Sequence, residues 1–202
     1  MQIVLCGFNI EGKKISIDEN GNRKVDPIDV SEVWWTKLEK QITKDYSIVS
    51  PEYKEMLMRY DGSDADYDAS NEPYRRIWSK SIVKPEYGRV YEDIDVLLVP
   101  LNDTFFNSMK SVVKFTEAGF TNTAVISSKV APYTDYGRNM VNCLFVDDMT
   151  PRGWARKIME LVDNEQLRFD ITKNLHNKVV QEHNIEMVSR KRDKLYSKLV
   201  KK

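Results

Sequence analysis

The residues best suited to chemistry lie between Asn107 and Glu117, where polar side chains recur at steps of three and four with Lys110, Ser111 and Lys114 between them. In a helix this spacing places all five side chains on one face. A lysine there can meet the charge of a phosphate, and a carboxylate further along can accept hydrogen bonds from ribose hydroxyls. The solvated face of an ordinary amphipathic helix has the same spacing. Spacing alone leaves both interpretations open.

The flanking sequence predicts the elements that would position these residues. Val96–Val99 is a continuous apolar run closed by Pro100, which is typical of a strand buried on both faces of a parallel sheet. A polar loop and a helix of about three turns follow, and we expect the helix to end at Gly119, because glycine readily adopts the left-handed conformation there. Thr123–Ser128 predicts a second buried strand. The helix N-terminus then lies at the carboxyl edge of the sheet, where parallel sheets bind ligands.

The same stretch carries a motif, F-N-S-M-K-S-V-V-K-F-T-E-A-G at residues 106–119, set between D-V-L-L-V-P-L and A-V-I-S-S. It resembles the carboxyl-terminal, donor-binding domain of family 4 (group 1) glycosyltransferases, in the capsule and surface-polysaccharide branch. The similarity extends from about Tyr87 to Tyr196. It implies an α/β fold: a Rossmann-like, three-layer parallel sheet of about five strands flanked by helices, which is half of a two-domain GT-B glycosyltransferase.

The resemblance also implies roles for individual residues. Glu117 matches the glutamate that binds the ribose of a nucleotide-sugar, and the amides from Lys110 to Val112 would lie against the diphosphate. Lys114 would be a charge partner of the phosphate or of Glu117. Many relatives have a further glutamate, which touches the sugar, where this chain has Met109, so sugar specificity and turnover are open. The implied donor-binding set is Asn107, Met109, Lys110, Ser111, Val112, Lys114 and Glu117.

The activity implied by the resemblance is that of a hexosyl-type glycosyltransferase. It would move a sugar from a UDP- or GDP-linked donor to an acceptor hydroxyl, with retention, in polysaccharide or glycolipid biosynthesis, and would need neither a metal nor another cofactor. No residue matches an acceptor-side base, so the catalytic residue is unknown and the chain alone is expected to be inactive. The alternative is a non-catalytic, transferase-like module that binds nucleotide or a partner protein. Met109 and the lack of a glycine-rich phosphate loop favour this alternative.

Length and composition set the frame for these interpretations. The 202 residues suit one domain over residues 1–202, with a helical tail over residues 150–202. A strand pattern that starts at Met1 indicates a fragment without the amino-terminal acceptor domain. Lysine plus arginine and aspartate plus glutamate both number 31, so no overall field attracts nucleic acid. Cys6 and Cys143 lie in apolar runs and are expected to be buried thiols, which indicates a cytoplasmic setting.

The stretch from Glu186 to the end has seven lysines and arginines against one aspartate and one glutamate. It predicts a basic amphipathic helix, which suits peripheral contact with the inner face of a membrane, although a solvated helix has the same pattern.

Asp64, Asp66 and Asp68 do not open a calcium loop, because Ala69 and Arg75 replace the required glycine and glutamate. The remaining pattern predicts a strand at residues 1–8, a hairpin around Asn20-Gly21, a helix from Asp29, a strand at residues 46–49, a helix from Pro51 and a short helix at residues 87–94. We expect Trp34 and Trp35 to lie in a core or an interface, and His176 and His183 to lie at the surface or in packing positions. The loop at residues 129–140 is expected to border the sugar or base.

Overall fold

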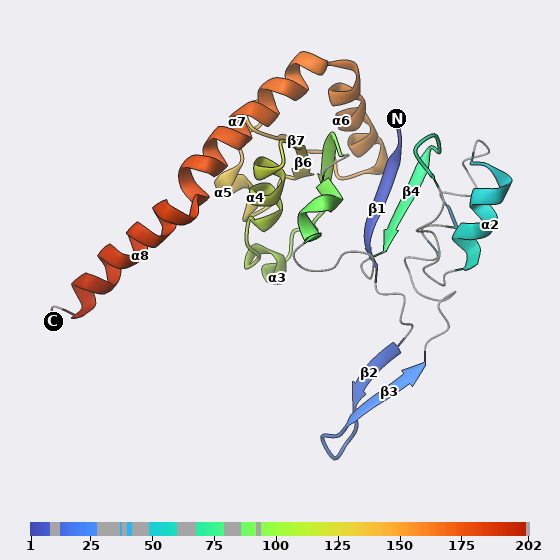
Figure 1. Ribbon diagram of the computed structural model, residues 1–202, viewed down its shortest axis with the longest axis horizontal. Coiled ribbons are helices and arrows are strands. Elements are labelled where there is room, and N and C mark those ends of the chain that lie inside the picture. The colour runs from blue at the N-terminus through green and yellow to red at the C-terminus, as the bar shows by residue number, and fades with distance from the viewer. Residues whose placement is uncertain are drawn as a thin grey trace. The chain divides into compact units, whose positions relative to one another are not determined.

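A computed structural model describes residues 1–8, 13–27, 37, 40–41, 49–59, 68–78, 86–91 and 94–200 (Figure 1). The chain divides into two compact units, Met1–Val90 and Tyr91–Lys202. Each unit is described by itself below. A single domain over residues 1–202, which the chain length indicated, stays a prediction.

The described part of the first unit includes two small sheets and the helix α2 (Pro51–Arg59). Strand β1 (Ile3–Phe8) pairs in parallel with β4 (Tyr74–Trp78), and β2 (Lys13–Ile17) forms an antiparallel hairpin with β3 (Arg23–Pro27). Helix α2 starts at the predicted proline. The predicted first strand, hairpin and helix are therefore confirmed. Most of the expected helix after Asp29 lies outside the described residues, but residues 37, 40 and 41 within it are helical. The tryptophan pair and nearly all of the expected strand at residues 46–49 also lie outside the described residues.

The second unit is built on a parallel sheet of three strands in the order β5-β6-β7, which are Val96–Val99, Ala124–Ser128 and Leu144–Val146. Val96 is opposite Ala124, and Ile126 is opposite Leu144. All five residues of β6 are buried, as expected for a central strand covered on both faces. Both predicted strands are present, but only β6 is buried on both faces. Strand β5 is an edge strand in which Val99 is buried and Leu98 is 43% exposed, because no described strand pairs with its other side. The described sheet of this unit has three strands, against about five expected for the domain.

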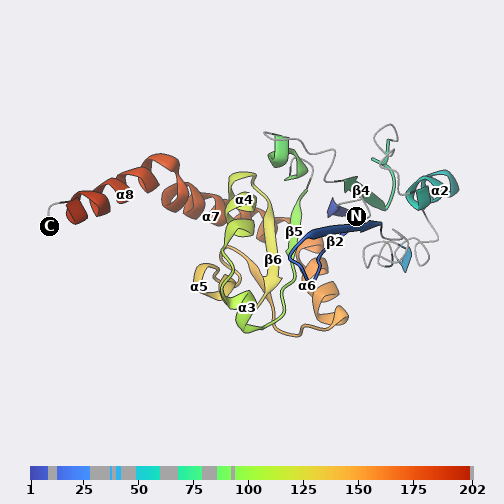
Figure 2. The ribbon, with the colours of Figure 1, turned by 90° about the horizontal axis from the view of Figure 1, so that it is seen from below.

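Helices cover both faces of this sheet, so the unit has three layers. On one face, Phe115 and Ala118 of α4 (Val113–Phe120) pack with Val179 of α7 (Glu165–His183). On the other face, α6 (Pro151–Asp163) contributes Leu161 and the first half of α7 contributes Ile171. Figure 2 shows α4 and α6 on opposite sides of the strands. The predicted α/β fold, a parallel sheet flanked by helices, is confirmed.

Gly119 does not end its helix, which corrects the sequence-based prediction. Helix α4 continues to Phe120, and the left-handed residue that follows is Asn122, with φ of 55°. Glycine is required at position 119 because α7 passes very close to it. A Cβ atom there would lie 2.5 Å from Cγ2 of Val179, well inside van der Waals contact. The glycine permits close helix packing instead of a turn.

The remaining helices are a 3-10 helix η4 (Glu86–Tyr91), two single turns α3 (Phe105–Ser108) and α5 (Tyr133–Tyr136), and α8 (Ile185–Val200). Helix α8 follows α7 after the single residue Asn184 and runs away from the sheet (Figures 1 and 2). None of its residues is buried. Among the described helices, none is both long enough and apolar enough to cross a membrane.

Candidate functional site

The predicted three-turn helix is interrupted, which corrects the expected arrangement of the polar stripe. Helix α3 ends at Ser108, and α4 begins only at Val113. Serines and β-branched valines at residues 111–113 are weak helix formers, and side-chain hydrogen bonds in the preceding loop compete with helix formation. Asn107 therefore lies in α3, Lys110 and Ser111 lie in the interruption, and only Lys114 and Glu117 share α4.

The loop after β5 is fixed to the carboxyl ends of two strands. The amide of Leu101 donates a hydrogen bond of 2.7 Å to Oγ of Ser128, the last residue of β6. Oγ1 of Thr104 caps α3 by accepting from the amide of Asn107 at 3.2 Å, and the Asn107 side chain donates to the carbonyl of Asn102 at 2.8 Å. The Asn107 side chain thus holds the loop in shape, a structural role that the sequence did not predict.

The start of α4 presents backbone amides at the carboxyl edge. The first intrahelical acceptor is the carbonyl of Val112, which receives the amides of Phe115 and Thr116 at 2.9 and 3.1 Å. The amides of Ser111, Val112 and Val113 precede this bond, and in the described part of the chain none has a protein acceptor. The amide of Lys110, by contrast, donates to the carbonyl of Asn107 at 3.1 Å. The available amides therefore extend from Ser111 to Val113, one residue later than predicted.

Glu117 belongs to a compact polar cluster with Lys114 and Tyr91. Its Oε2 atom accepts a hydrogen bond from the Tyr91 hydroxyl at 2.5 Å and one from Nζ of Lys114 at 2.8 Å. Nζ of Lys114 also lies 3.2 Å from the Tyr91 hydroxyl. The side chains of Lys114 and Glu117 are 43% and 26% exposed, so solvent reaches the ion pair. Lys114 is thus a charge partner of Glu117, one of its two expected roles.

The two carboxylate oxygens of Glu117 differ in their surroundings. Both donors approach Oε2, and no described residue gives Oε1 a hydrogen-bond partner. Burial of Tyr91 raises the pKa of its hydroxyl, and the hydrogen bond to Glu117 raises it further, so the hydroxyl remains a donor at neutral pH. A carboxylate can accept several hydrogen bonds, so Glu117 is held in position through Oε2 while Oε1 keeps its capacity to accept further hydrogen bonds.

Sequence analysis did not identify Tyr91 as part of this cluster. It ends η4, 26 residues before Glu117, and no spacing rule connects the two positions. The short helix predicted at residues 87–94 is present as η4, but it gave no indication that Tyr91 would contact α4.

The loop between α3 and α4 is largely exposed. Met109 is 73% exposed. Nζ of Lys110 lies 5.8 Å from the ring centroid of Phe106, which is exposed together with Phe105. Among the described residues, no group of three or more histidine, cysteine, aspartate or glutamate side chains is arranged to hold a metal ion. Met109 and Lys110 are accessible but have no fixed partner that would define a sugar subsite.

The loop at residues 129–140, which was expected to border the sugar or base, contributes in part to the hydrophobic core. Tyr133 is buried and stacks on Phe115, with ring centroids 5.3 Å apart. Lys129 extends from the end of β6 and forms an exposed ion pair of 2.7 Å with Asp147 at the end of β7. This hydrogen bond lowers the pKa of the Asp147 carboxyl. The loop therefore contributes Lys129 to the carboxyl edge, whereas Tyr133 supports α4 from beneath.

The histidines lie in packing positions. Nδ1 of His176 lies 2.9 Å from the carbonyl of Gly119, and the His183 ring packs against Tyr136 at 5.5 Å between centroids. Of the two cysteines, Cys143 is buried as expected, whereas Cys6 is only partly buried. The packing interpretation of His176 and His183 agrees with these contacts.

Comparisons with known proteins give a fold and no closer relationship. No family model and no curated protein sequence matches the chain. Among solved structures, Anabaena HepE in complex with UDP has a TM-score of 0.50 at 11% identity, covering 73% of this chain and 36% of HepE. HepE with UDP and glucose gives 0.51 at 10% identity, covering 73% and 37%. The C-terminal domain of LpcC, a group 1 glycosyl transferase family protein from Francisella tularensis, gives 0.46 at 17% identity, covering 66% and 63%.

The chain thus spans little more than a third of the length of HepE. At these identities the likeness concerns the fold alone. The chain shares with HepE an α/β fold, which here is a parallel sheet flanked by helices.

Proposed function

We propose that this chain is the donor-binding half of a glycosyltransferase and that it binds a UDP-linked sugar at the start of α4. The observation that carries the proposal is the Glu117 carboxylate, whose Oε2 is held by Tyr91 and Lys114 while Oε1 has no partner among the described residues. A carboxylate held in this way can accept hydrogen bonds from both hydroxyls of a ribose. Because the Glu117 side chain is already ordered, binding would cost little of its conformational entropy. The complex of HepE with UDP supports the choice of uridine over guanosine.

The diphosphate of the donor would lie against the amides of Ser111, Val112 and Val113, which have no protein acceptor in the described part of the chain. Amides at a helix start carry partial positive charge and point toward an anion. Lys114, one residue further on, adds a full positive charge while it stays paired with Glu117. Together they would stabilise the charge that develops on the leaving diphosphate.

Sugar transfer itself would require groups beyond those named here. Glu117 orients the ribose and moves no proton, and an acceptor-binding domain would bring the acceptor hydroxyl to the anomeric carbon. Hexosyl transfer with retention, without a metal, and a role in polysaccharide or glycolipid synthesis are part of this proposal. They rest on the resemblance of residues 106–119 to the motif of family 4 enzymes.

Helix α8 supports a location at the inner face of a membrane. Ile185, Leu195 and Leu199 recur at helical spacing on one side and are 75%, 55% and 63% exposed. Arg190, Lys194 and Lys198 occupy the opposite side at steps of four. An exposed apolar stripe with a basic face is the pattern of a helix that lies on an anionic lipid surface, where a lipid-linked acceptor would be found.

A second candidate function is a non-catalytic module that binds nucleotide or a partner protein. Met109 favours it, because an exposed methionine offers no hydrogen bond to a sugar hydroxyl where many similar enzymes have a glutamate. Such a module would bind UDP and UDP-sugar with equal affinity, since the sugar would make no additional polar contact at this position.

Calorimetric titration with UDP, GDP and ADP tests the proposal. We expect saturable binding of UDP that is lost in Glu117→Ala. Glu160→Ala is a matched control, because Lys157 and Glu160 form an ion pair with the same three-residue spacing on α6, at 2.7 Å. Equal UDP binding by the wild type and Glu117→Ala would overturn the assignment of the site. Tighter binding of UDP-glucose than of UDP would exclude the second candidate, the non-catalytic module, because that module would make no contact with the sugar.

A further inference from the structure

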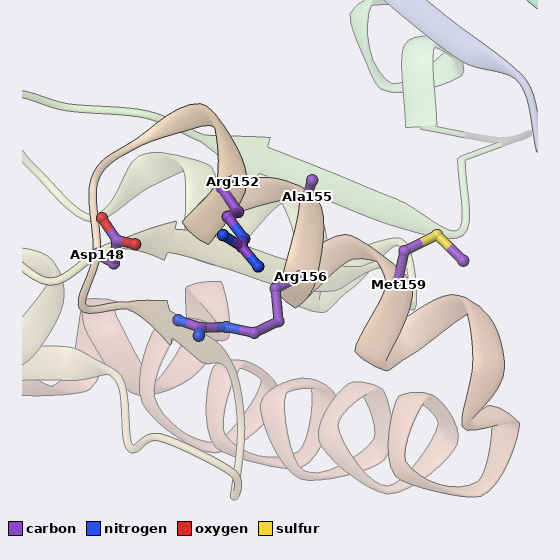
Figure 3. A pocket seen from close by; sticks show the side chains of 5 residues that line it. All are labelled: Asp148, Arg152, Ala155, Arg156 and Met159. Atoms are coloured by element: carbon purple, nitrogen blue, oxygen red, sulfur yellow. The ribbon is translucent and has the colours of Figure 1, made fainter.

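A second charged site lies at the start of α6, on the face of the sheet opposite α4. Arg152 and Arg156 are one helical turn apart and line an open hollow of about 570 Å³ together with Asp148, Ala155 and Met159. In Figure 3 the Arg156 side chain extends toward the side on which Asp148 lies, and the Arg152 guanidinium group lies next to it. The two side chains can therefore contact one ligand at the same time.

Neither arginine has a partner within the described part of the chain. The neighbouring charges are already paired: Lys129 with Asp147 and Lys157 with Glu160, both at 2.7 Å. Asp148 faces the arginines without forming an ion pair, and its Oδ1 accepts a hydrogen bond from the amide of Thr150 at 3.1 Å. Two guanidinium groups against one carboxylate leave a net positive charge at the hollow.

The chemistry of this site suits a phosphate group. A guanidinium offers a planar pair of donors that matches two phosphate oxygens, and two such groups on successive turns can bind one phosphate from two directions. A phosphomonoester, with up to two negative charges, gains more from the pair than a carboxylate or a phosphodiester. Arginines without partners, one turn apart, thus indicate a doubly charged ligand.

Two of the residues that line the hollow are apolar, which narrows the class of ligand. These are Ala155 and Met159, and Met159 is 44% exposed. Large exposed apolar side chains next to paired cations form a surface that is both charged and apolar. Inorganic phosphate would use only the cationic part of such a surface.

We propose that Arg152 and Arg156 bind the phosphomonoester head group of a lipid, with Met159 against the start of its apolar chain. This site lies apart from the proposed nucleotide site on α4 and does not depend on it.

Vesicle flotation of the full chain tests the proposal. The vesicles are phosphatidylcholine alone, phosphatidylcholine with phosphatidic acid, which carries a phosphomonoester, and phosphatidylcholine with phosphatidylserine at equal surface charge. We expect Arg152→Gln/Arg156→Gln to lower binding to phosphatidic acid vesicles by about tenfold or more and to leave binding to phosphatidylserine vesicles nearly unchanged. Arg190→Gln/Lys194→Gln on α8 is the charge-matched control, and it should weaken binding to both anionic vesicles equally.

Three further results would separate the alternatives. Arg152→Lys/Arg156→Lys keeps the charge but loses the planar donor pairs, so it should lose most of the preference for phosphatidic acid. An equal loss on both anionic vesicles in the glutamine variant would overturn phosphate recognition in favour of general charge attraction. Binding of inorganic pyrophosphate that depends on the arginines and abolishes vesicle binding would assign the site to a free phosphate and overturn the lipid. UDP affinity should be unchanged in both arginine variants, which keeps this test independent of the nucleotide site.

Discussion

The two faces of α4 have opposite roles, although the helix has only eight residues. Its inner face buries Phe115, Ala118 and Gly119 against the sheet and α7. Its outer face carries Lys114 and Glu117, which remain partly exposed and contact Tyr91. The inner contacts fix the helix, so the outer carboxylate can be positioned for a ligand and contribute little to stability. Stability and binding should therefore respond to different substitutions.

The largest expected effect is on the inner face, with Gly119→Ala. Alanine is the better helix former by about 1 kcal/mol, but its Cβ would lie 2.5 Å from Cγ2 of Val179. We expect the clash to dominate and to lower the free energy of unfolding by about 1–3 kcal/mol. Urea denaturation followed by circular dichroism measures this change.

Val179→Ala provides the control for that substitution, because it removes the clashing methyl groups. The double variant should be more stable than the sum of the two single effects predicts, since the new Cβ fills part of the space left at Val179. Additive effects, or a Gly119→Ala variant more stable than the wild type, would show that the two helices do not meet as closely as described.

On the outer face, Glu117→Ala should separate binding from stability. Loss of the carboxylate removes both ribose hydrogen bonds, so UDP affinity should fall at least tenfold, or about 1.4 kcal/mol. The exposed ion pair with Lys114 is worth roughly 0.2–1 kcal/mol, and the midpoint of urea unfolding should change little. A large loss of stability in this variant would mean that the outer face also supports the fold.

Tyr91→Phe tests the hydrogen bond between Tyr91 and Glu117, which we expect to contribute both to UDP binding and to stability. It removes the hydroxyl that holds Oε2 of Glu117, so UDP affinity should fall severalfold and the free energy of unfolding by about 0.5–1.5 kcal/mol. The pKa of Tyr91 is raised in the folded chain, so the stability it contributes is full below the unfolded value of about 10 and falls as pH rises beyond it. Thermal unfolding between pH 8 and about 11 should show a steeper alkaline decline for the wild type than for Tyr91→Phe. Parallel curves would contradict the buried hydroxyl.

The smallest effect is expected at the exposed pair between Lys129 and Asp147. Its hydrogen bond lowers the pKa of Asp147, so the stabilisation is present above the ordinary carboxyl pKa of about 4 and is lost as pH falls through the lowered value. Asp147→Asn should lower stability at neutral pH by no more than a few tenths of a kcal/mol, because solvent screens the pair. The difference from the wild type in thermal unfolding should vanish at acid pH, and a difference that persists there would assign the effect to packing.

The parts of the fold that sequence could predict are those where one physical cause dominates. Continuous apolar runs identified β5 and β6, and Thr150 followed by Pro151 identified the start of α6, where the threonine side chain accepts from the amide of Gly153. Gly119 was misassigned because a glycine near a helix end can serve a turn or a close helix contact, and only the position of α7 decides between them.

The candidate site was predictable in part for a similar reason. The motif located Glu117 and Lys114 correctly on one helix face, but the interruption at residues 109–112 depends on hydrogen bonds within the loop that side-chain spacing does not reveal. Tyr91 reaches Glu117 from a different element, so no local pattern indicated it. Contacts between distant segments are set by tertiary packing, which single-sequence patterns record only indirectly.

The contact at Gly119 has a mechanical consequence for the molecule. Because α7 packs this closely on α4, and because His176 forms a hydrogen bond with the carbonyl of Gly119, we expect the two helices to move as one rigid body. Asn184, the non-helical residue between α7 and α8, is the expected hinge between that rigid body and α8. Helix α8 adds an arm of about 24 Å beyond the hinge, given 16 residues at 1.5 Å each. A displacement of α8 would therefore be transmitted to α7, α4 and Glu117 only if the backbone at Asn184 stays rigid.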